Sequence, residues 1–135
     1  MIPEMKKLIS ARLAGNVLLI AMALLMVFHV LVLIGVVPAA AIWGGQVQAG
    51  TGALVVMEVI AMGVTLVFAA IIAAKAGYLK AGRLRIVVKI GVWLIFAFLV
   101  LNTLGNLASG VSTEGLIFAP ITLILAFFAF RLAIE

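Results

Sequence analysis

The sequence predicts an all-α membrane protein, a bundle of four transmembrane helices with both termini on the cytoplasmic side. Composition is the first reason, because 68% of the 135 residues are hydrophobic and only 10% are charged, far from the balance of a soluble domain. The second reason is that the apolar residues form four runs long enough to cross a bilayer as helices. The third is that, with four crossings, every basic residue falls on one side.

The four apolar runs leave little chain for anything else, so a single domain is expected over residues 1–135. A helix crosses the hydrocarbon core with about 20 residues, and the alternating pattern of a membrane β-barrel is absent. A cleaved signal peptide is the alternative for the first run, but that run is too long and no small-residue cleavage site clearly follows it. The expected helices cover residues 17–37, 53–74, 90–108 and 116–134, with an outer loop at 38–52 and a cytoplasmic loop at 75–89.

Lysine and arginine residues set the expected orientation. They precede the first run, occupy the second connection or lie in the last turn of the fourth run, at Lys6, Lys7, Arg12, Lys75, Lys80, Arg83, Arg85, Lys89 and Arg131. The positive-inside rule makes this side cytoplasmic. These residues can contact anionic lipid head groups, and Lys89 and Arg131 are expected to reach the interface without a buried partner. No nucleic-acid partner is expected, and the charge imbalance argues against a dual-topology dimer of the kind found in small multidrug transporters.

Polar residues of the membrane segments are expected to gather in the outer half. At about 1.5 Å of rise per residue, His29 would lie roughly 13 Å below the outer end of the first helix and Glu58 roughly 8 Å below that of the second. Asn102, Asn106 and Thr122 come out about 5–10 Å deep on the third and fourth helices. The inner halves of all four runs are almost entirely apolar. The pattern predicts one site near the outer surface above an apolar floor, and it argues against a continuous water-filled pore.

Glu58 is the strongest single indication of function. A carboxylate at this depth costs roughly 2 to 3 kcal/mol, so it should face the bundle interior, be protonated or have a partner. His29 is the only histidine and lies on the neighbouring helix, so we expect a hydrogen bond between the two. A role in binding a ligand, an ion or a proton is the first interpretation. A structural hydrogen bond between helices is the alternative for Glu58, and a bond to a single carbonyl is the alternative for His29.

Two asparagines are expected to complete this site. Asn102 and Asn106 are one helical turn apart and share a face, although amides also serve as packing contacts between membrane helices. Thr122 is included among the candidate ligand-binding residues, but a threonine readily bonds the backbone of its own helix. Pro120 removes a backbone donor early in the fourth helix and can free a carbonyl of the preceding turn.

The outer loop contains the segment AIWGGQVQAG at 41–50, which has three glycines and no charge. An uncharged loop can fold back toward the membrane when its backbone is buried in protein or lines a cavity. Trp43 is expected to anchor this loop at the interface, with Gln46 and Gln48 facing the site, and all three are candidate ligand-binding residues. A plain external loop is the alternative. Glu114, which follows a serine and a threonine, is interpreted first as an N-terminal cap of the fourth helix.

The segments HVLVLIGVVP, IWGGQV, LNTLGN and FAPIT, together with Glu58 and Glu114, give the chain a resemblance to a group of small four-helix bacterial inner-membrane proteins of uncharacterised activity. The resemblance extends over nearly the whole chain. It implies a multi-pass protein of the bacterial cytoplasmic membrane, and it implies no activity. The chain lacks the acidic and tryptophan signature of the sterol isomerase and sigma-2 receptor group, and it lacks the glycine-rich asparagine pattern of fluoride channels.

These residues favour a protein that binds or transports a small polar, cationic or amphipathic molecule, with Glu58 and His29 at the centre of its site. A structural or accessory membrane subunit is the second interpretation, and a membrane enzyme that uses the two residues for acid–base chemistry is the third. Neither a cofactor nor a metal is expected, because one histidine and one membrane carboxylate are too few ligands for a site within one chain. The expected partners are lipids and a small molecule, and homo-oligomerisation stays open.

Overall fold

The computed structural model describes all residues 1–135 and contains only helices and connections, so the all-α prediction is confirmed. Four helical segments are long and apolar enough to cross a membrane, which identifies a multi-pass membrane protein. They are α2 (Ala11–Leu33), α3 (Gly52–Lys75), α4 (Arg85–Ala108) and a fourth segment formed by the turn η4 (Glu114–Phe118) and α5 (Ala119–Ala133). The short elements are α1 (Ile2–Leu8), η1 (Ala39–Ala41), η2 (Trp43–Gly45) and η3 (Gly82–Leu84).

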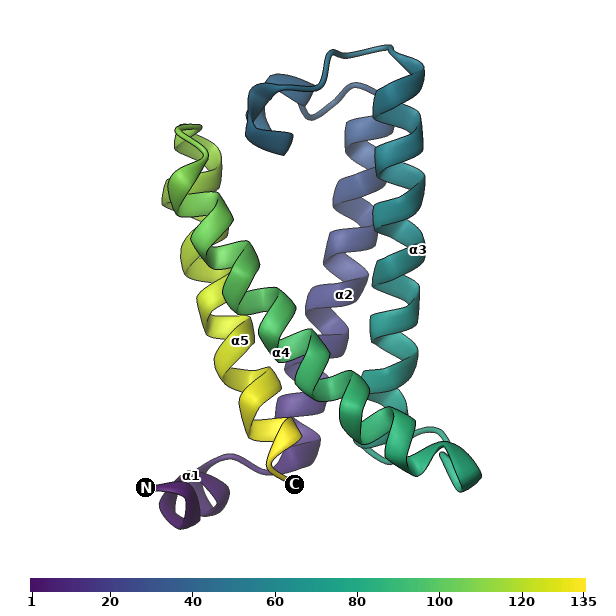
Figure 1. Ribbon diagram of the computed structural model, residues 1–135, viewed down its shortest axis with the longest axis vertical. Helices are drawn as coiled ribbons and strands as arrows, with labels where there is room; N and C mark the ends of the chain where they lie inside the picture. Colours follow the sequence, from purple (N-terminus) through teal and green to yellow (C-terminus); the bar gives the residue numbers. More distant parts are fainter.

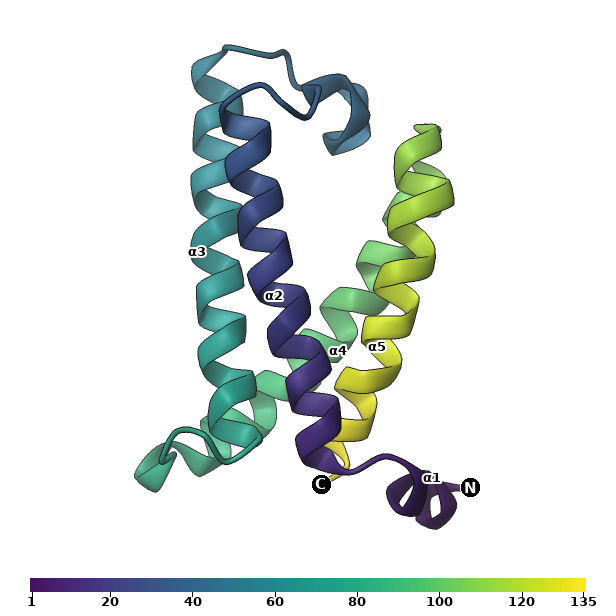
Figure 2. The ribbon, with the colours of Figure 1, turned by 180° about the vertical axis from the view of Figure 1, so that it is seen from behind.

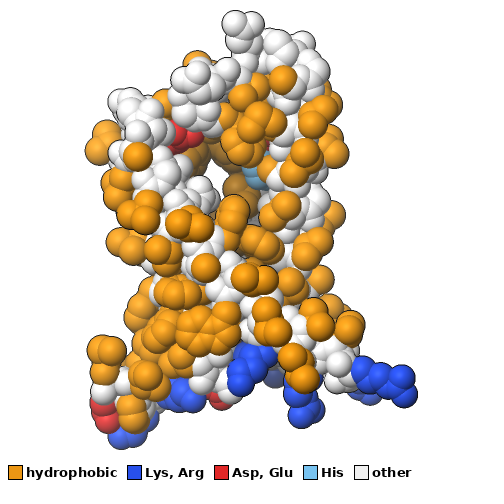
Figure 3. Space-filling view, in the orientation of Figure 1, with side chains coloured by type: hydrophobic (Ala, Val, Ile, Leu, Met, Phe, Trp, Pro, Cys, Tyr) orange, Lys and Arg blue, Asp and Glu red, His pale blue; other side chains and the backbone are white.

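The four long helices form two hairpins, α2 with α3 and α4 with α5 (Figures 1 and 2). Both termini lie at one end of the bundle, and the loop between α2 and α3 lies at the other end (Figure 1). The lysine and arginine side chains visible in Figure 3 gather at the end that holds the termini, which we call the basic end. The opposite end is called the loop end. The two hairpins approach each other toward the basic end and diverge toward the loop end in both ribbon views.

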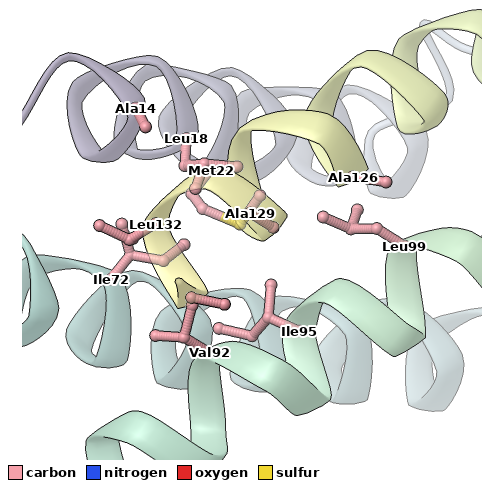
Figure 4. Close-up of a cluster of buried hydrophobic side chains, with 11 residues drawn as sticks. Ala14, Leu18, Met22, Ile72, Val92, Ile95, Leu99, Ala126, Ala129 and Leu132 are labelled. Atoms are coloured by element: carbon pink, nitrogen blue, oxygen red, sulfur yellow. The ribbon is translucent and has the colours of Figure 1, made fainter. Parts of the chain in front are cut away.

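An apolar core joins all four long helices in the part of the bundle nearer the basic end (Figure 4). Leu18 of α2, Ile72 of α3, Ile95 of α4 and Leu132 of α5 belong to it and have no exposed surface. In lipid, such a core stabilises the bundle through close van der Waals packing rather than through removal of apolar surface from water. The apolar floor that the sequence predicts is therefore confirmed.

Side-chain caps decide where α2 and α3 begin. The hydroxyl groups of Ser10 and Thr51 accept hydrogen bonds from the backbone N–H groups of Leu13, at 3.0 Å, and Leu54, at 3.3 Å. Serine and threonine are favoured at this position because they satisfy a backbone donor that the first helical turn leaves free. As a result, α2 begins at Ala11 rather than at the expected residue 17.

Both helices of this hairpin end at a glycine with a left-handed backbone, Gly35 after α2 (φ 80°) and Gly77 after α3 (φ 90°). The N–H that follows each glycine bonds to the carbonyl five residues earlier, at 2.9 Å and 2.8 Å respectively. This is the Schellman arrangement, which favours glycine because other residues are strained at positive φ. Helix α2 thus ends at Leu33 and not at residue 37, so His29 lies only about 6 Å below the helix end.

The second hairpin also differs from the expected boundaries. Helix α4 begins at Arg85 instead of residue 90. The fourth segment begins with the wide π-helical turn η4, in which the N–H of Ala119 bonds to the carbonyl of Glu114, five residues back. Pro120 follows at once and lacks the N–H that a regular α-helix would use. The sequence predicted that Pro120 can free a backbone carbonyl early in this helix, and the structure has a π turn at that place. Turns of this kind are often found at functional sites.

Arg131 is not where the sequence places it. Its side chain is almost fully buried, its Nε donates to the carbonyl of Ile9 at 2.6 Å, and its Nη1 donates to Glu135 at 2.9 Å. The expectation that Arg131 needs no buried partner is wrong, because the connection between α1 and α2 folds over it and supplies an acceptor. No sequence pattern predicted α1, which projects beside the basic end (Figures 1 and 2).

Gly15 provides a test of the packing within the first hairpin. A Cβ added at Gly15 would lie 2.5 Å from the Cβ of Ala76. We expect Gly15→Val to lower the free energy of unfolding by about 1–3 kcal/mol through overpacking, measured by thermal unfolding in detergent. Gly63→Ala is the control, because a Cβ there meets no atom within 4 Å and alanine is the better helix former. An unfolding temperature unchanged by Gly15→Val would contradict this contact.

Candidate functional site

Glu58 of α3 is the centre of the candidate site, and its side chain has no exposed surface. Its Oε2 lies 2.6 Å from Nδ1 of His29 on α2, and its Oε1 accepts a hydrogen bond of 2.7 Å from the indole N–H of Trp43. The hydrogen bond between His29 and Glu58 that the sequence predicts is therefore present. Each carboxyl oxygen has its own partner, one from the neighbouring helix and one from the outer loop.

The outer loop brings Trp43 to Glu58 by an unusual backbone path. Trp43, Gly44 and Gly45 are three successive residues with φ of 54°, 63° and 71°. Glycine adopts such left-handed angles freely, whereas a bulky residue such as tryptophan adopts them at a cost of order 1–3 kcal/mol. The turn directs the indole N–H toward Glu58, and the half-buried Trp43 ring stays a prediction as an anchor at the membrane interface. The hydrogen bond to Glu58 is the interaction that offsets this strain.

Glu114 holds the residue next to Trp43. Its Oε1 accepts a 2.9 Å hydrogen bond from the backbone N–H of Gly44, and its side chain is buried. The interpretation of Glu114 as a helix cap is wrong, because its carboxylate bonds the outer loop and no side-chain cap bond is formed at η4. We call the two bonds from Trp43 and Gly44 to Glu58 and Glu114 the loop clasp. Because Glu58 lies on one hairpin and Glu114 on the other, the loop clasp connects the hairpins where they diverge.

The sequence did contain a signal for Glu114 that its cap interpretation missed. The chain has four acidic residues, and Glu4 and Glu135 lie at the basic end among lysines and arginines. Glu58 and Glu114 are the only charged side chains in the membrane half next to the outer loop. Two isolated carboxylates in an apolar region need hydrogen-bond donors, and an uncharged loop rich in backbone N–H groups was the nearest source.

Other predicted site residues lie apart from Glu58. Asn102 is exposed, Asn106 is half-buried, and neither side chain makes a hydrogen bond in the structure, so the asparagines do not complete the pair. Gln46 and Gln48 are exposed on the loop, where the Gln46 amide donates back to the Gly44 carbonyl at 3.3 Å. The asparagines lie apart because of the rotation of α4 about its axis, which turns Thr103, and not its neighbour Asn102, toward the bundle interior.

Thr103 and Thr122 form a separate polar contact between α4 and α5. Their hydroxyl oxygens lie 2.8 Å apart, and each hydroxyl also lies within hydrogen-bond distance of a carbonyl of its own helix, so the two protons are shared among these acceptors. Thr122 thus has the backbone bonding that the sequence suggested for it. The polar layer expected from all four helices is therefore divided, because this contact does not join the Glu58 group.

The space around the loop clasp combines polar and apolar surfaces. Figure 3 shows a hollow between the hairpins below the loop, with acidic and histidine side chains visible at its edges. The rings of Phe28 and Phe118 meet edge to face, with centroids 5.3 Å apart, and so connect α2 with η4. A small apolar cluster that includes Val32, Ile42 and Leu54 lies beside them at the loop end. An apolar rim around buried carboxylates is suited to an amphipathic molecule.

The Glu58–His29 pair can change its net charge by one proton. It is neutral either as carboxylate with imidazolium or as carboxylic acid with neutral imidazole, and loss of one proton leaves a net charge of −1. A cation bound beside Glu58 would balance the charge of its carboxylate in the place of that proton. His29 and Glu58 have no third His, Cys, Asp or Glu beside them to complete a metal site.

Comparison with known proteins adds no family to this description, since no protein-family model, curated protein or solved structure matches the chain.

The contribution of the His29–Glu58 pair to stability can be tested by removing one partner and then both. His29→Phe leaves a buried carboxylate with a single donor, and we expect it to lower the free energy of unfolding by about 3–5 kcal/mol. The double change His29→Phe with Glu58→Leu removes the uncompensated carboxylate but also the acceptor of the Trp43 indole N–H, so part of this loss should be recovered. Thermal unfolding in detergent measures both. A double variant no more stable than His29→Phe would show that the pair does not account for the loss.

Proposed function

We propose that this protein binds or transports a small polar, cationic or amphipathic molecule at an outward-facing site in the outer half of the membrane, with Glu58 and His29 as the central groups. The observation that carries the proposal is a carboxylate with no exposed surface whose second partner, Trp43, comes from a loop instead of a helix. Ionisable groups inside membranes cost several kcal/mol to place there and usually serve function.

The charge states of the Glu58–His29 pair favour a cation among these ligands. A cationic group next to Glu58 would neutralise the carboxylate in place of the proton, so binding and proton release would be coupled. A neutral polar ligand could only exchange hydrogen bonds with the pair. The same exchange would let a proton gradient drive release of the molecule if the protein is a transporter.

The loop clasp supports a gating role for the outer loop. Trp43 covers one oxygen of Glu58, so a ligand can reach that oxygen only after the indole has moved. The positive φ of Trp43 makes this conformation costly, so little energy would be needed to release it once the hydrogen bond is lost. The hollow beneath the loop opens between helices covered by apolar side chains (Figure 3). A molecule with an apolar part could therefore enter from the lipid side.

The apolar core near the basic end supports binding in the outer half more directly than passage through the bundle. It joins all four helices below the site, with no polar path among its members. Transport would require the hairpins to separate there or a second copy of the chain to supply a path. Asn102, Asn106, Gln46, Gln48 and Thr122 stay predictions as ligand contacts.

We further propose that the protein lies in the bacterial inner membrane with both termini in the cytoplasm. The gathering of lysine and arginine at the end that holds the termini supports this orientation by the positive-inside rule.

An accessory or structural subunit is the second candidate function. One specific observation favours it: no buried side-chain nitrogen or oxygen lacks a hydrogen-bond partner. A structural role, in which the network fixes the helices and the loop, is enough to explain this arrangement. A ligand would first have to break some of these hydrogen bonds.

The orientation can be tested with single cysteines, since the chain has none of its own. In intact cells, a cysteine at Gln48 should react with a membrane-impermeant maleimide, and one at Lys80 should react only after the membrane is opened. The reverse labelling pattern would overturn the orientation.

Ligand binding can be tested with two amphipathic cations, tetraphenylphosphonium and dodecylammonium. We expect at least one of them to raise the unfolding temperature of the purified protein and to release up to one proton per chain in weakly buffered solution. Glu58→Gln should remain folded and lose both effects, because the amide cannot exchange a proton for a cation.

Glu4→Gln is the matched control, since it removes an exposed carboxylate far from the site, and it should behave like the unchanged protein. Stabilisation that persists in Glu58→Gln would overturn the role of Glu58. If neither cation stabilises the protein, the accessory role becomes the better explanation.

A further inference from the structure

A second cavity lies at the basic end, far along the bundle from the loop clasp. It has a volume of about 440 Å³ and lies between the end of α3 and the beginning of α4. Three cationic side chains line it, Lys75 from α3 and Arg85 and Lys89 from α4. Ligand pockets for small molecules typically begin at about 300 Å³, so the space is sufficient for a small polar group.

None of the three cations forms an ion pair with an acidic side chain, although Lys75 is close enough to Glu135 for their charges to attract. The ion pairs of the structure involve other basic residues, and the one acid that lines the cavity, Glu135, is bound by Arg131 at 2.9 Å and approached by Lys6 at 3.9 Å. The hydrogen bond from Arg131 lowers the pKa of the Glu135 carboxyl, which keeps it ionised at neutral pH. Arg131 and Lys6 already contact this carboxylate, and the three cations outnumber it, so the cavity wall keeps a net positive charge.

The placement of these cations is unfavourable without a counter-ion. Arg85 and Lys89 are four residues apart on one face of α4, where like charges repel. Both lie in the first turns of α4, at the end of a helix that disfavours positive charge. An anion in the cavity would relieve both effects. Four basic side chains of the connection and early α4 are exposed, but only Arg85 and Lys89 line the cavity, whereas Lys80 and Arg83 lie outside it.

We propose that this cavity binds a phosphate group, either in the head group of an anionic phospholipid or in a small phosphorylated molecule. Phosphate matches the site because its oxygens can accept hydrogen bonds from the Arg85 guanidinium and from both lysine ammonium groups at once. The surrounding surface agrees with a site at the membrane boundary, since Ile86, Val87 and Ile90 of α4 are exposed apolar residues beside the cationic ones. The proposal is independent of the site at Glu58.

Two double variants with the same change in charge and composition test the proposal. Arg85→Gln with Lys89→Gln removes one arginine and one lysine from the cavity, and Lys80→Gln with Arg83→Gln removes one of each from positions that do not line it, whereas all four side chains are exposed. Each cation near an anionic surface is worth about 1 kcal/mol, so the cavity variant should bind on the order of thirtyfold more weakly. The control variant should keep most of the affinity.

The measurement is binding to the purified protein of phosphatidylglycerol, of phosphatidylcholine and of glycerol phosphate, by native mass spectrometry and thermal shift. Preferential binding of phosphatidylglycerol, weakened only in the cavity variant, supports a lipid head-group site. Binding of glycerol phosphate with the same dependence supports a soluble phosphate ligand.

Glu135→Gln should strengthen binding, because it removes the one negative charge at the wall. If the two double variants weaken binding equally, the affinity depends on diffuse surface charge and not on the cavity, and the proposal is overturned. The proposal is also overturned if the protein binds neither phosphatidylglycerol nor glycerol phosphate.

Discussion

A carboxylate inside a membrane must find hydrogen-bond partners within the protein, and the loop end of this structure is organised around that requirement. Glu58 is surrounded by apolar helices and has no lysine or arginine within its half of the bundle. Its partners are therefore an imidazole from α2 and an indole from the outer loop. The early end of α2 at Leu33 and the left-handed turn at Trp43 both serve to bring these two groups to the same carboxylate.

The two ends of the bundle are stabilised in different ways. Near the basic end, all four helices share a close-packed apolar core. At the loop end, the hairpins diverge and are joined by the loop clasp and by the contact of Phe28 with Phe118. A region held by a few hydrogen bonds opens at lower cost than one held by a continuous core. Movement near Glu58 is thus expected at the loop end, while the apolar core holds the four helices together nearer the basic end.

The sequence by itself determined the helical class, the number of apolar helices long enough to cross a membrane, the gathering of basic residues at one end, the apolar floor and the His29–Glu58 contact. These properties depend on composition and on depth. In a membrane the backbone must form helices, and a helix rises by about 1.5 Å per residue, so position along the chain converts directly into depth. Two polar residues at similar depth on adjacent helices, with few other partners available, were therefore correctly paired.

Only the tertiary structure decided which side chains at a given depth meet. Asn102 and Thr103 have nearly the same depth, yet packing of α4 turns the threonine inward and the asparagine outward. The path of an irregular loop is likewise set by its contacts, so the inward turn of Trp43 and the bond from Gly44 to Glu114 had no periodic signal. The physical reason is that helical rise fixes height, whereas rotation about the helix axis and loop conformation depend on the packing of every neighbouring element.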